Sequence, residues 1–284
     1  EGVEVVYLPV QKEGMVDLKK LESLLDERTL MVSIMYANNE IGTIEPIAEI
    51  SKIIQRLKKQ IREGEDISKP PIYPLFHTDA SQAFQFLDCN AEKLGVDLMT
   101  ISAHKIYGPK GVGVLYIREL TPNTYHLKPI ITGGGQEFSL RSGTENVPLI
   151  VGFAKAVELI QKNKDREAGR LSVLSEYFLG GLKKIYPKVE LNCPKEKSER
   201  LPNILNIYFT DYEAEDLFLK FDLRGLAVSV GSACRSRSAE PSYVLRALGF
   251  GRDRIKKSLR ISLGRPTAKS EIDKALGIIK IILK

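Results

Sequence analysis

Lys105 is the residue whose position in this sequence most favours covalent chemistry. It follows an apolar stretch, residues 97–101, that reads as a short buried strand, and the Gly and Pro residues of 108–111 interrupt the chain after it. At the end of a buried strand, desolvation and the neighbouring Ser102 and His104 would lower the pKa of the lysine amine and make it nucleophilic. Such an amine can form a Schiff base with a carbonyl cofactor. Taken alone, Lys105 is more simply explained as an ordinary loop lysine.

Asp79 ends another predicted strand and precedes Lys105 by about one strand–helix–strand crossover. A carboxylate at this place could pair with the pyridinium nitrogen of pyridoxal phosphate and keep the ring an electron sink. The alternative is a helix N-cap, a role that aspartate often fills. Asn39 and Gln82 could hydrogen-bond the ring hydroxyl of such a cofactor, although both residue types are also common in turns. Three further side chains can donate to a phosphate: Ser102, His104 and Thr144.

Cys234 is the cysteine with the most reactive surroundings. It lies in a stretch of small residues and serines, 229–241, in which Arg235 and Arg237 are nearby cations that favour the thiolate. A structural cysteine is normally embedded in apolar residues. Arg260 stands in a predicted strand, from which its guanidinium could clamp a substrate carboxylate through two hydrogen bonds. A surface ion pair is the simpler alternative for this arginine.

The composition is that of a soluble globular protein. The 284 residues suffice for one large domain or two ordinary ones, with 43% hydrophobic and 27% charged residues. No apolar run approaches the roughly 20 residues needed to cross a bilayer. The three cysteines and three histidines form no paired spacing, so neither a disulfide framework nor a zinc site is expected, and a reducing cytoplasm is the default compartment. The net charge of +6 is spread along the chain, which is weak support for a nucleic-acid partner.

Strands alternate with helices in the first half of the chain. The spacing of apolar residues predicts helices over residues 17–27 and after Pro46. This alternation favours an α/β fold with a mainly parallel sheet, whose functional residues lie at the carboxyl ends of the strands. Asn39, Asp79 and Lys105 all follow predicted strands. The predicted strands cover residues 3–8, 30–36, 72–77, 97–101 and 112–117.

The second half of the chain alternates shorter elements. Two long helices are expected over residues 147–163 and 166–185, or one helix bent near 162–165. The last helix is expected to have Thr267 or Ser270 as its N-cap. Strands are predicted over residues 189–192, 203–209, 228–230 and 258–263, with helices over 213–221 and 241–248.

These patterns predict two domains. We expect a large domain over residues 1–160 and a smaller α+β domain over residues 161–284. The chain begins with Glu1 close to the predicted strand 3–8 and without an initiator methionine. We therefore expect it to be a piece of a longer protein, with an incomplete large domain.

Six motifs follow one another through the chain. They are Tyr-Ala-Asn-Asn-Glu-Ile-Gly at 36–42, His-Thr-Asp-Ala-Ser-Gln at 77–82, Ser-Ala-His-Lys-Ile-Tyr-Gly-Pro-Lys-Gly at 102–111, Arg-Ser-Gly-Thr at 141–144, Gly-Ser-Ala-Cys at 231–234 and Glu-Pro-Ser-Tyr-Val-Leu-Arg-Ala-Leu-Gly at 240–249. In this series the sequence resembles the cysteine desulfurases, pyridoxal-phosphate enzymes of the class-V aminotransferase superfamily. The long Ser-rich continuation after Cys234 resembles the IscS/NifS group, whereas the SufS-like group has a shorter loop. The resemblance covers the whole chain.

The resemblance implies fold type I of the pyridoxal-phosphate enzymes and a role for each cofactor residue. It implies that Lys105 forms the Schiff base with the cofactor and that Asp79 pairs with the pyridine nitrogen. Asn39 and Gln82 would contact the ring hydroxyl. Ser102 and His104 would hold the phosphate. Thr144 would reach the phosphate of the cofactor in the partner subunit of a homodimer.

The resemblance also implies removal of sulfur from L-cysteine. Arg260, together with Asn39, would bind the substrate carboxylate, and the Lys105 amine would move the Cα proton. Cys234 would attack the substrate sulfur, leaving a Cys234 persulfide and L-alanine. His104 is expected to take part in catalysis beside Lys105. An acceptor such as an iron–sulfur scaffold protein, or tRNA thiolation, would then receive the sulfur.

The chain is expected to depart from the family pattern at its start, at its end, beside Cys234 and within residues 62–74. Family members carry a further part before the position of Glu1, which supplies a phosphate loop and a histidine stacked on the cofactor ring. Residues 62–74 look like an insertion. Two alternatives are therefore kept: a selenocysteine lyase or related class-V enzyme, and a non-catalytic fragment that binds the cofactor weakly or not at all.

Overall fold

The computed structural model describes residues 2–63, 73–118, 127–231 and 241–283. The chain folds as two compact units, which we name after their strands. The division into domains of residues 1–160 and 161–284 stays a prediction, and the compact units differ from it because two early segments group with the C-terminal residues. The β1–β4 unit comprises residues 24–36 and 46–163, and the β5–β8 unit comprises residues 1–23, 37–45 and 164–284.

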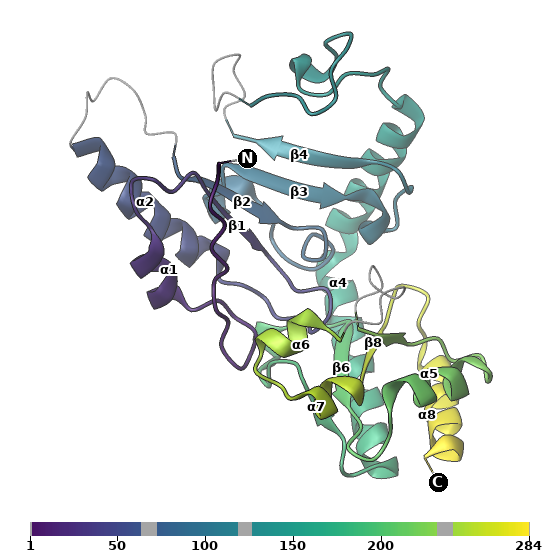
Figure 1. Cartoon of the computed structure of the whole chain (residues 1–284). Coiled ribbons are helices and arrows are strands. Elements are labelled where there is room, and N and C mark those ends of the chain that lie inside the picture. Colours follow the sequence, from purple (N-terminus) through teal and green to yellow (C-terminus); the bar gives the residue numbers. More distant parts are fainter. Residues whose placement is uncertain (1, 64–72, 119–126, 232–240, 284) are drawn as a thin grey trace. The chain divides into compact units, whose positions relative to one another are not determined.

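A four-stranded sheet forms the centre of the β1–β4 unit (Figure 1). Its order is β1–β2–β3–β4, in which β1, β2 and β3 are parallel and β4 is antiparallel to β3. Phe76 on β2 and Met99 on β3 are fully buried, as expected for strands covered on both faces. The mainly parallel α/β arrangement expected from the sequence is confirmed. The strands are β1 (Met31–Met35), β2 (Leu75–Asp79), β3 (Leu98–Ser102) and β4 (Gly113–Ile117).

Helix α2 (Ile47–Glu63) is the long crossover helix of this unit and begins directly after Pro46. Proline suits the start of a helix because the first backbone N–H groups have no partner inside the helix. Ile47, Ile50 and Ile54 are almost completely buried, and their spacing of three and four residues places them on one stripe. This apolar stripe explains why the helix forms where the sequence predicts it.

Asp97, directly before β3, is the buried charge that connects these elements. Its Oδ2 accepts hydrogen bonds from Lys58 Nζ of α2 and from the Phe76 N–H of β2, both at 2.8 Å. Its own N–H donates to the Phe76 carbonyl oxygen at 2.8 Å. The side chains of Lys58 and Asp97 are only 9% and 6% exposed, so the charge would be costly without these partners. The pair therefore holds α2 and the beginnings of β2 and β3 together.

The β5–β8 unit contains a second four-stranded sheet. Its order is β5–β6–β8–β7, and every pair of neighbouring strands is antiparallel. Ile207 on β6 and Leu259 on β8 are fully buried at its centre. Antiparallel strands with helices are the α+β arrangement expected for the second half of the chain. The strands are β5 (Glu190–Leu191), β6 (Ile204–Tyr208), β7 (Ser229–Val230) and β8 (Ser258–Ser262).

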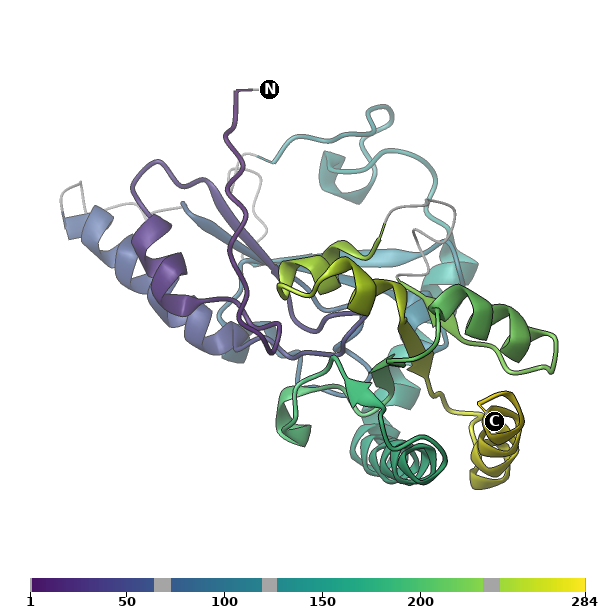
Figure 2. The same ribbon diagram turned by 60° about the horizontal axis from the view of Figure 1, so that its bottom comes forward.

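The longest helix, α4, runs without interruption through the position where the sequence suggests a break or a bend. Residues 161–168 contain neither Gly nor Pro, so nothing in the local sequence ends the helix. Figure 2 shows α8 beside the C-terminal part of α4, where the Tyr177 hydroxyl donates to Asp273 at 2.6 Å. The helices besides α2 are α1 (Leu18–Leu24), α3 (Ala91–Leu94), α4 (Val147–Ile185), α5 (Ala214–Asp222), α6 (Tyr243–Ala247), α7 (Arg252–Lys256) and α8 (Lys269–Ile282).

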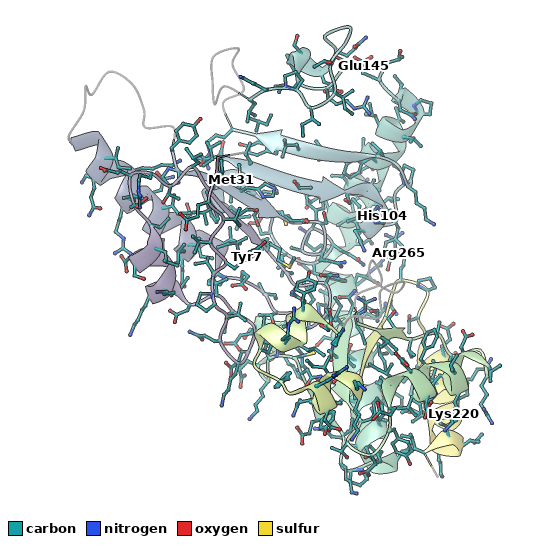
Figure 3. The ribbon with its side chains drawn as sticks, viewed as in Figure 1. Tyr7, Met31, His104, Glu145, Lys220 and Arg265 are labelled. Carbon is teal, nitrogen blue, oxygen red and sulfur yellow. The ribbon has the colours of Figure 1, made fainter. Side chains whose placement is uncertain are left out.

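The strand expected over residues 3–8 is wrong. In the described part of the chain no strand pairs with these residues, and a single strand has no partner for its backbone groups. Val3, Val5 and Tyr7 are accordingly 63%, 68% and 89% exposed; Tyr7 is labelled in Figure 3.

The two expected N-cap residues of α8 are also wrong, one by one residue and the other by two. Ala268 occupies that position, rather than Thr267 or Ser270. Glu271 Oε2 accepts the Ala268 N–H at 2.9 Å, so the glutamate supplies the acceptor at this helix start.

The first prediction concerns the buried pair. Asp97→Asn leaves the Lys58 ammonium buried without an anionic partner, and we expect a loss of about 3–5 kcal/mol in the free energy of unfolding, measured by urea denaturation. The matched control is Asp88→Asn, since the Asp88–Lys93 pair has the same 2.8 Å distance but is 60% and 72% exposed. The control should cost less than about 1 kcal/mol. Equal losses in both variants would contradict the role of Asp97.

The second prediction concerns Glu45, whose Oε2 accepts the Val16 N–H at 3.0 Å. Burial raises the pKa of Glu45 from 4.5 to about 7. The folded protein therefore holds this proton to higher pH than the unfolded chain, so stability falls as pH rises from 4.5 to about 7. Glu45→Gln keeps the acceptor and removes the titration. Between about pH 5 and pH 8, wild type should lose on the order of 3 kcal/mol of unfolding free energy relative to Glu45→Gln. A difference that does not change with pH would sink this assignment.

Candidate active site

Asp79 and Ser102 are the last residues of β2 and β3. The two strands are parallel neighbours, with Asp79 opposite Thr100, so their carboxyl ends meet at one edge of the sheet. Asp79 is half-buried, and its Oδ1 accepts the Ser81 N–H at 2.8 Å. This hydrogen bond orients the carboxyl group at the strand end.

His104 and Lys105 lie in a short 3-10 turn, residues Ala103–Ile106, directly after β3; Figure 3 labels His104. The turn anchors itself through Ala103 and Ile106, which are completely buried. Tyr107 ends it with a left-handed φ of 65°. His104 and Lys105 are exposed, so the expectation that Lys105 is desolvated is wrong for the described part of the chain. The turn instead presents the amine outward beside the carboxyl end of β3.

A polar row crosses the three parallel strands next to Asp79. Ser33 Oγ on β1 lies 2.8 Å from His77 Nδ1 on β2, and His77 Nε2 lies 2.9 Å from Thr100 Oγ1 on β3. His77 is two residues before Asp79, so both side chains face the same side of the sheet. Burial lowers the pKa of His77, while the Asp79 charge acts in the opposite direction. This face of the sheet is therefore a hydrogen-bonded polar surface.

Arg260 lies on β8 in the β5–β8 unit and is half-buried. Its Nη1 donates to the Asn39 carbonyl oxygen at 3.0 Å and its Nη2 to Ser229 Oγ at 3.2 Å. Asn206 on β6 and Ser229 on β7 are its partners in the sheet register. Two uncharged oxygen atoms from different segments of the chain thus orient the guanidinium.

The turn that carries Asn39 is held by side chains. Asn38 Oδ1 accepts the N–H groups of Glu40 and Ile41 at 2.8 and 3.1 Å. Asn206 Nδ2 donates to the Glu40 carbonyl oxygen at 3.3 Å. Asn39 and Arg260 are therefore brought together by the fold of one unit.

The remaining predicted residues have fewer contacts. Gln82 is half-buried in the turn that follows β2, three residues after Asp79. Thr144 is exposed in the segment before α4. Cys234 lies outside the described residues. The predicted site residues fall into two sets. The β5–β8 unit contains Asn39 and Arg260, and the β1–β4 unit contains Asp79, Gln82, Ser102, His104, Lys105 and Thr144.

Sequence reasoning missed the hydrogen-bonded neighbours of these residues. Ser33 and Thr100 carry no signal of their own, because only the strand register places them beside His77. Glu40 carries no such signal either, because it stands in a polar motif and only the structure shows that it is completely buried. Ser229 is one of many serines in its stretch, and only β7–β8 pairing brings it to Arg260.

The donor set at the ends of β2 and β3 fits pyridoxal phosphate. Asp79 offers a carboxylate for the ring nitrogen, and Lys105 offers an exposed primary amine for the aldehyde. Ser102 and His104 offer a hydroxyl and an imidazole for the phosphate. Within the described ranges, no cluster of three or more His, Cys, Asp or Glu side chains could hold a metal ion. No helix there is both long and apolar enough to cross a membrane.

Comparison with known proteins gives consistent results. The aminotransferase class-V family matches residues 1–275. A cysteine desulfurase IscS from Dictyoglomus turgidum is 45% identical over 283 residues, covering 100% of this chain and 66% of that protein. A cysteine desulfurase IscS 1 from Archaeoglobus fulgidus is 41% identical, covering 100% of this chain and 68% of that protein. The chain spans about two thirds of the length of the relatives it matches.

Solved structures agree with these relatives. A NifS-like protein superposes with a TM-score of 0.85 at 36% identity, covering 99% of this chain and 68% of its own. A NifS-like protein from Rickettsia africae superposes with a TM-score of 0.81 at 33% identity, covering 97% and 68%. The fold type and the pyridoxal-phosphate cofactor expected from the sequence are thereby confirmed. The chain belongs to the class-V aminotransferase family and, within it, to the pyridoxal-phosphate-dependent cysteine desulfurases.

Proposed function

We propose that the protein removes sulfur from L-cysteine, gives L-alanine, and keeps the sulfur as a persulfide on Cys234. The observation that carries the proposal is the position of Lys105 in an exposed turn after β3, next to the strand that ends in Asp79. This arrangement places an amine and an acid at one sheet edge, in a chain whose relatives are named cysteine desulfurases.

The β1–β4 unit would hold the cofactor. Asp79 binds the pyridine nitrogen, Gln82 contacts the ring hydroxyl, and Ser102 and His104 bind the phosphate. Lys105 would hold pyridoxal phosphate until the substrate amino group takes the place of its amine, and the cofactor would then supply an electron sink for the bonds at the substrate Cα. The Lys105 amine then carries the Cα proton, and its exposed position in the turn gives it access to that proton. His104, beside it, orients the phosphate end of the site.

The β5–β8 unit would hold the substrate carboxylate. Arg260 is oriented by Asn39 and Ser229, and a guanidinium can donate two parallel hydrogen bonds to a carboxylate. The Cys234 thiolate attacks the substrate sulfur, so a sulfur–sulfur bond forms and the carbon–sulfur bond breaks. The substrate carbon keeps the bonding electron pair and takes up a proton, which yields L-alanine. Asn39 supports this site through its carbonyl oxygen.

We also propose a homodimer in the cytoplasm that passes its sulfur to an acceptor such as an iron–sulfur scaffold protein. Thr144 is exposed before α4, from where it could reach the phosphate of the partner's cofactor. Exposed apolar residues of the same region support a protein contact there: Ile130, Ile131, Phe138, Val147 and Val151. In the proposed division, the domain of residues 1–160 binds the cofactor and that of 161–284 carries Cys234.

The third prediction tests the amine. Borohydride reduction should attach the cofactor covalently to wild type and not to Lys105→Ala, as mass spectrometry of the intact protein would show. Lys110→Ala is the matched control, because Lys110 is an exposed lysine five residues along the same motif. It should be labelled like wild type. Covalent labelling of Lys105→Ala at the wild-type level would remove Lys105 from this role.

The fourth prediction tests the sulfur acceptor. Cys234→Ser should still bind the cofactor but lose sulfide and alanine production by more than about 100-fold, since a hydroxyl cannot form a persulfide. Cys89→Ser is the control, as Cys89 is a half-buried cysteine of the other unit. Wild-type turnover in Cys234→Ser, or an equal loss in Cys89→Ser, would refute the assignment of Cys234.

A further inference from the structure

Glu40 is a buried charged residue of the β5–β8 unit that the proposed chemistry does not use. Its exposed fraction is 0%. Its backbone is fixed on both sides, because its N–H donates to Asn38 Oδ1 and its carbonyl oxygen accepts from Asn206. Neither carboxylate oxygen makes a hydrogen bond of good geometry to any described residue. A buried carboxylate in this state is costly, so its charge must be offset or taken up by a proton.

Arg260 is the charged group that acts on Glu40 from the elements around it. Burial, the largest effect, raises the pKa of Glu40. The Ser242 hydroxyl before α6 and the Arg260 charge lower that pKa. The remaining neighbour on β6 is the uncharged amide of Asn206. The Arg260 guanidinium also donates to the carbonyl oxygen of Asn39, the residue directly before Glu40.

In the cluster of Glu40 and Arg260, the single guanidinium can balance one negative charge. A substrate carboxylate bound to Arg260 adds a second anion close to Glu40, and like charges disfavour each other's ionised form. We propose that Glu40 is a positioning residue that sets the charge of the carboxylate-binding site, taking up a proton from solvent when the substrate carboxylate binds Arg260. The inference rests on the proposed function, since the substrate carboxylate at Arg260 is part of it.

The consequence is a specific pH dependence. Where Glu40 is already protonated, the carboxylate ligand binds Arg260 without any proton uptake by Glu40. Where Glu40 is ionised, binding must also protonate it, so affinity falls as the pH rises through the pKa of Glu40. Glu40→Gln removes this dependence while keeping the size of the side chain. All other titrating groups of the site are shared, so they cancel in the ratio of the two proteins.

The fifth prediction is tested with L-alanine, the product, as a non-reacting ligand of the holoenzyme. Because the pKa of Glu40 is raised from 4.5, calorimetry above that pH should give a dissociation constant that rises with pH in wild type, relative to Glu40→Gln, by about tenfold in all. The dependence of the binding heat on buffer ionisation should show a proton taken up by wild type and not by Glu40→Gln. Glu45→Gln, which removes another buried carboxyl of the same unit, should behave like wild type. Ethylamine, which lacks the carboxylate, should show no difference among the three proteins.

Two outcomes would overturn the inference: the same pH dependence of L-alanine binding in wild type and Glu40→Gln, or an equal difference with ethylamine. If Glu40→Gln does not fold, Ser242→Ala replaces it. Loss of that hydroxyl removes a group that lowers the pKa of Glu40, so the fall in affinity should move to higher pH, and an unmoved profile counts against the proposal. Failure of the proposed function is a separate result, namely a wild-type holoenzyme that releases no alanine from cysteine.

Discussion

The β1–β4 unit depends on the register of its parallel strands, and the buried Asp97 carboxylate fixes that register at the strand beginnings. Because its Oδ2 binds both Lys58 and the Phe76 N–H, α2, β2 and β3 are tied at one point. A slip of β3 by one residue would turn all of its side chains to the opposite face. Asp79 at the far end of β2 would then lose its place beside the end of β3. A buried ion pair at one edge of the sheet therefore positions the polar groups at the other edge.

In the β5–β8 unit, hydrogen bonds to uncharged groups hold the site residues in position. The register of β6, β8 and β7 places Asn206, Arg260 and Ser229 side by side, and two of them donate to backbone carbonyl oxygens of the Asn38–Glu40 turn. The turn is thus attached to the sheet without any ion pair in its hydrogen bonds. The hydrogen bonds that orient Arg260 run to a carbonyl and a hydroxyl oxygen rather than to a bidentate carboxylate. Such an arrangement suits a binding group better than a structural one.

Much of the fold and several site residues could be predicted from the sequence, because strand ends and the apolar faces of helices are local patterns. Asp79 and Lys105 follow apolar stretches, and the isoleucines of α2 recur at helical spacing. What failed depends on distant residues. Residues 3–8 have strand composition but no described partner strand, and the exposure of Lys105 follows from a 3-10 turn that buries its neighbours. The polar row through His77 exists only because strands far apart in sequence pair in register. Glu40 is buried in a turn that is bonded to Asn206, a residue equally distant in sequence. No local pattern contains that information.

Glu40 and Glu45 show why burial alone does not identify a functional carboxyl group. Both lie in the segment of residues 37–45, both are buried, and desolvation raises both pKa values. Glu45 meets a backbone N–H, a partner that no ligand can change, so its protonation responds only to pH and folding. Glu40 interacts electrostatically with the Arg260 guanidinium, and this interaction changes whenever an anion binds to Arg260. Only the second carboxyl group can therefore connect its protonation to occupancy of a site, and the difference lies in the neighbour rather than in the depth of burial.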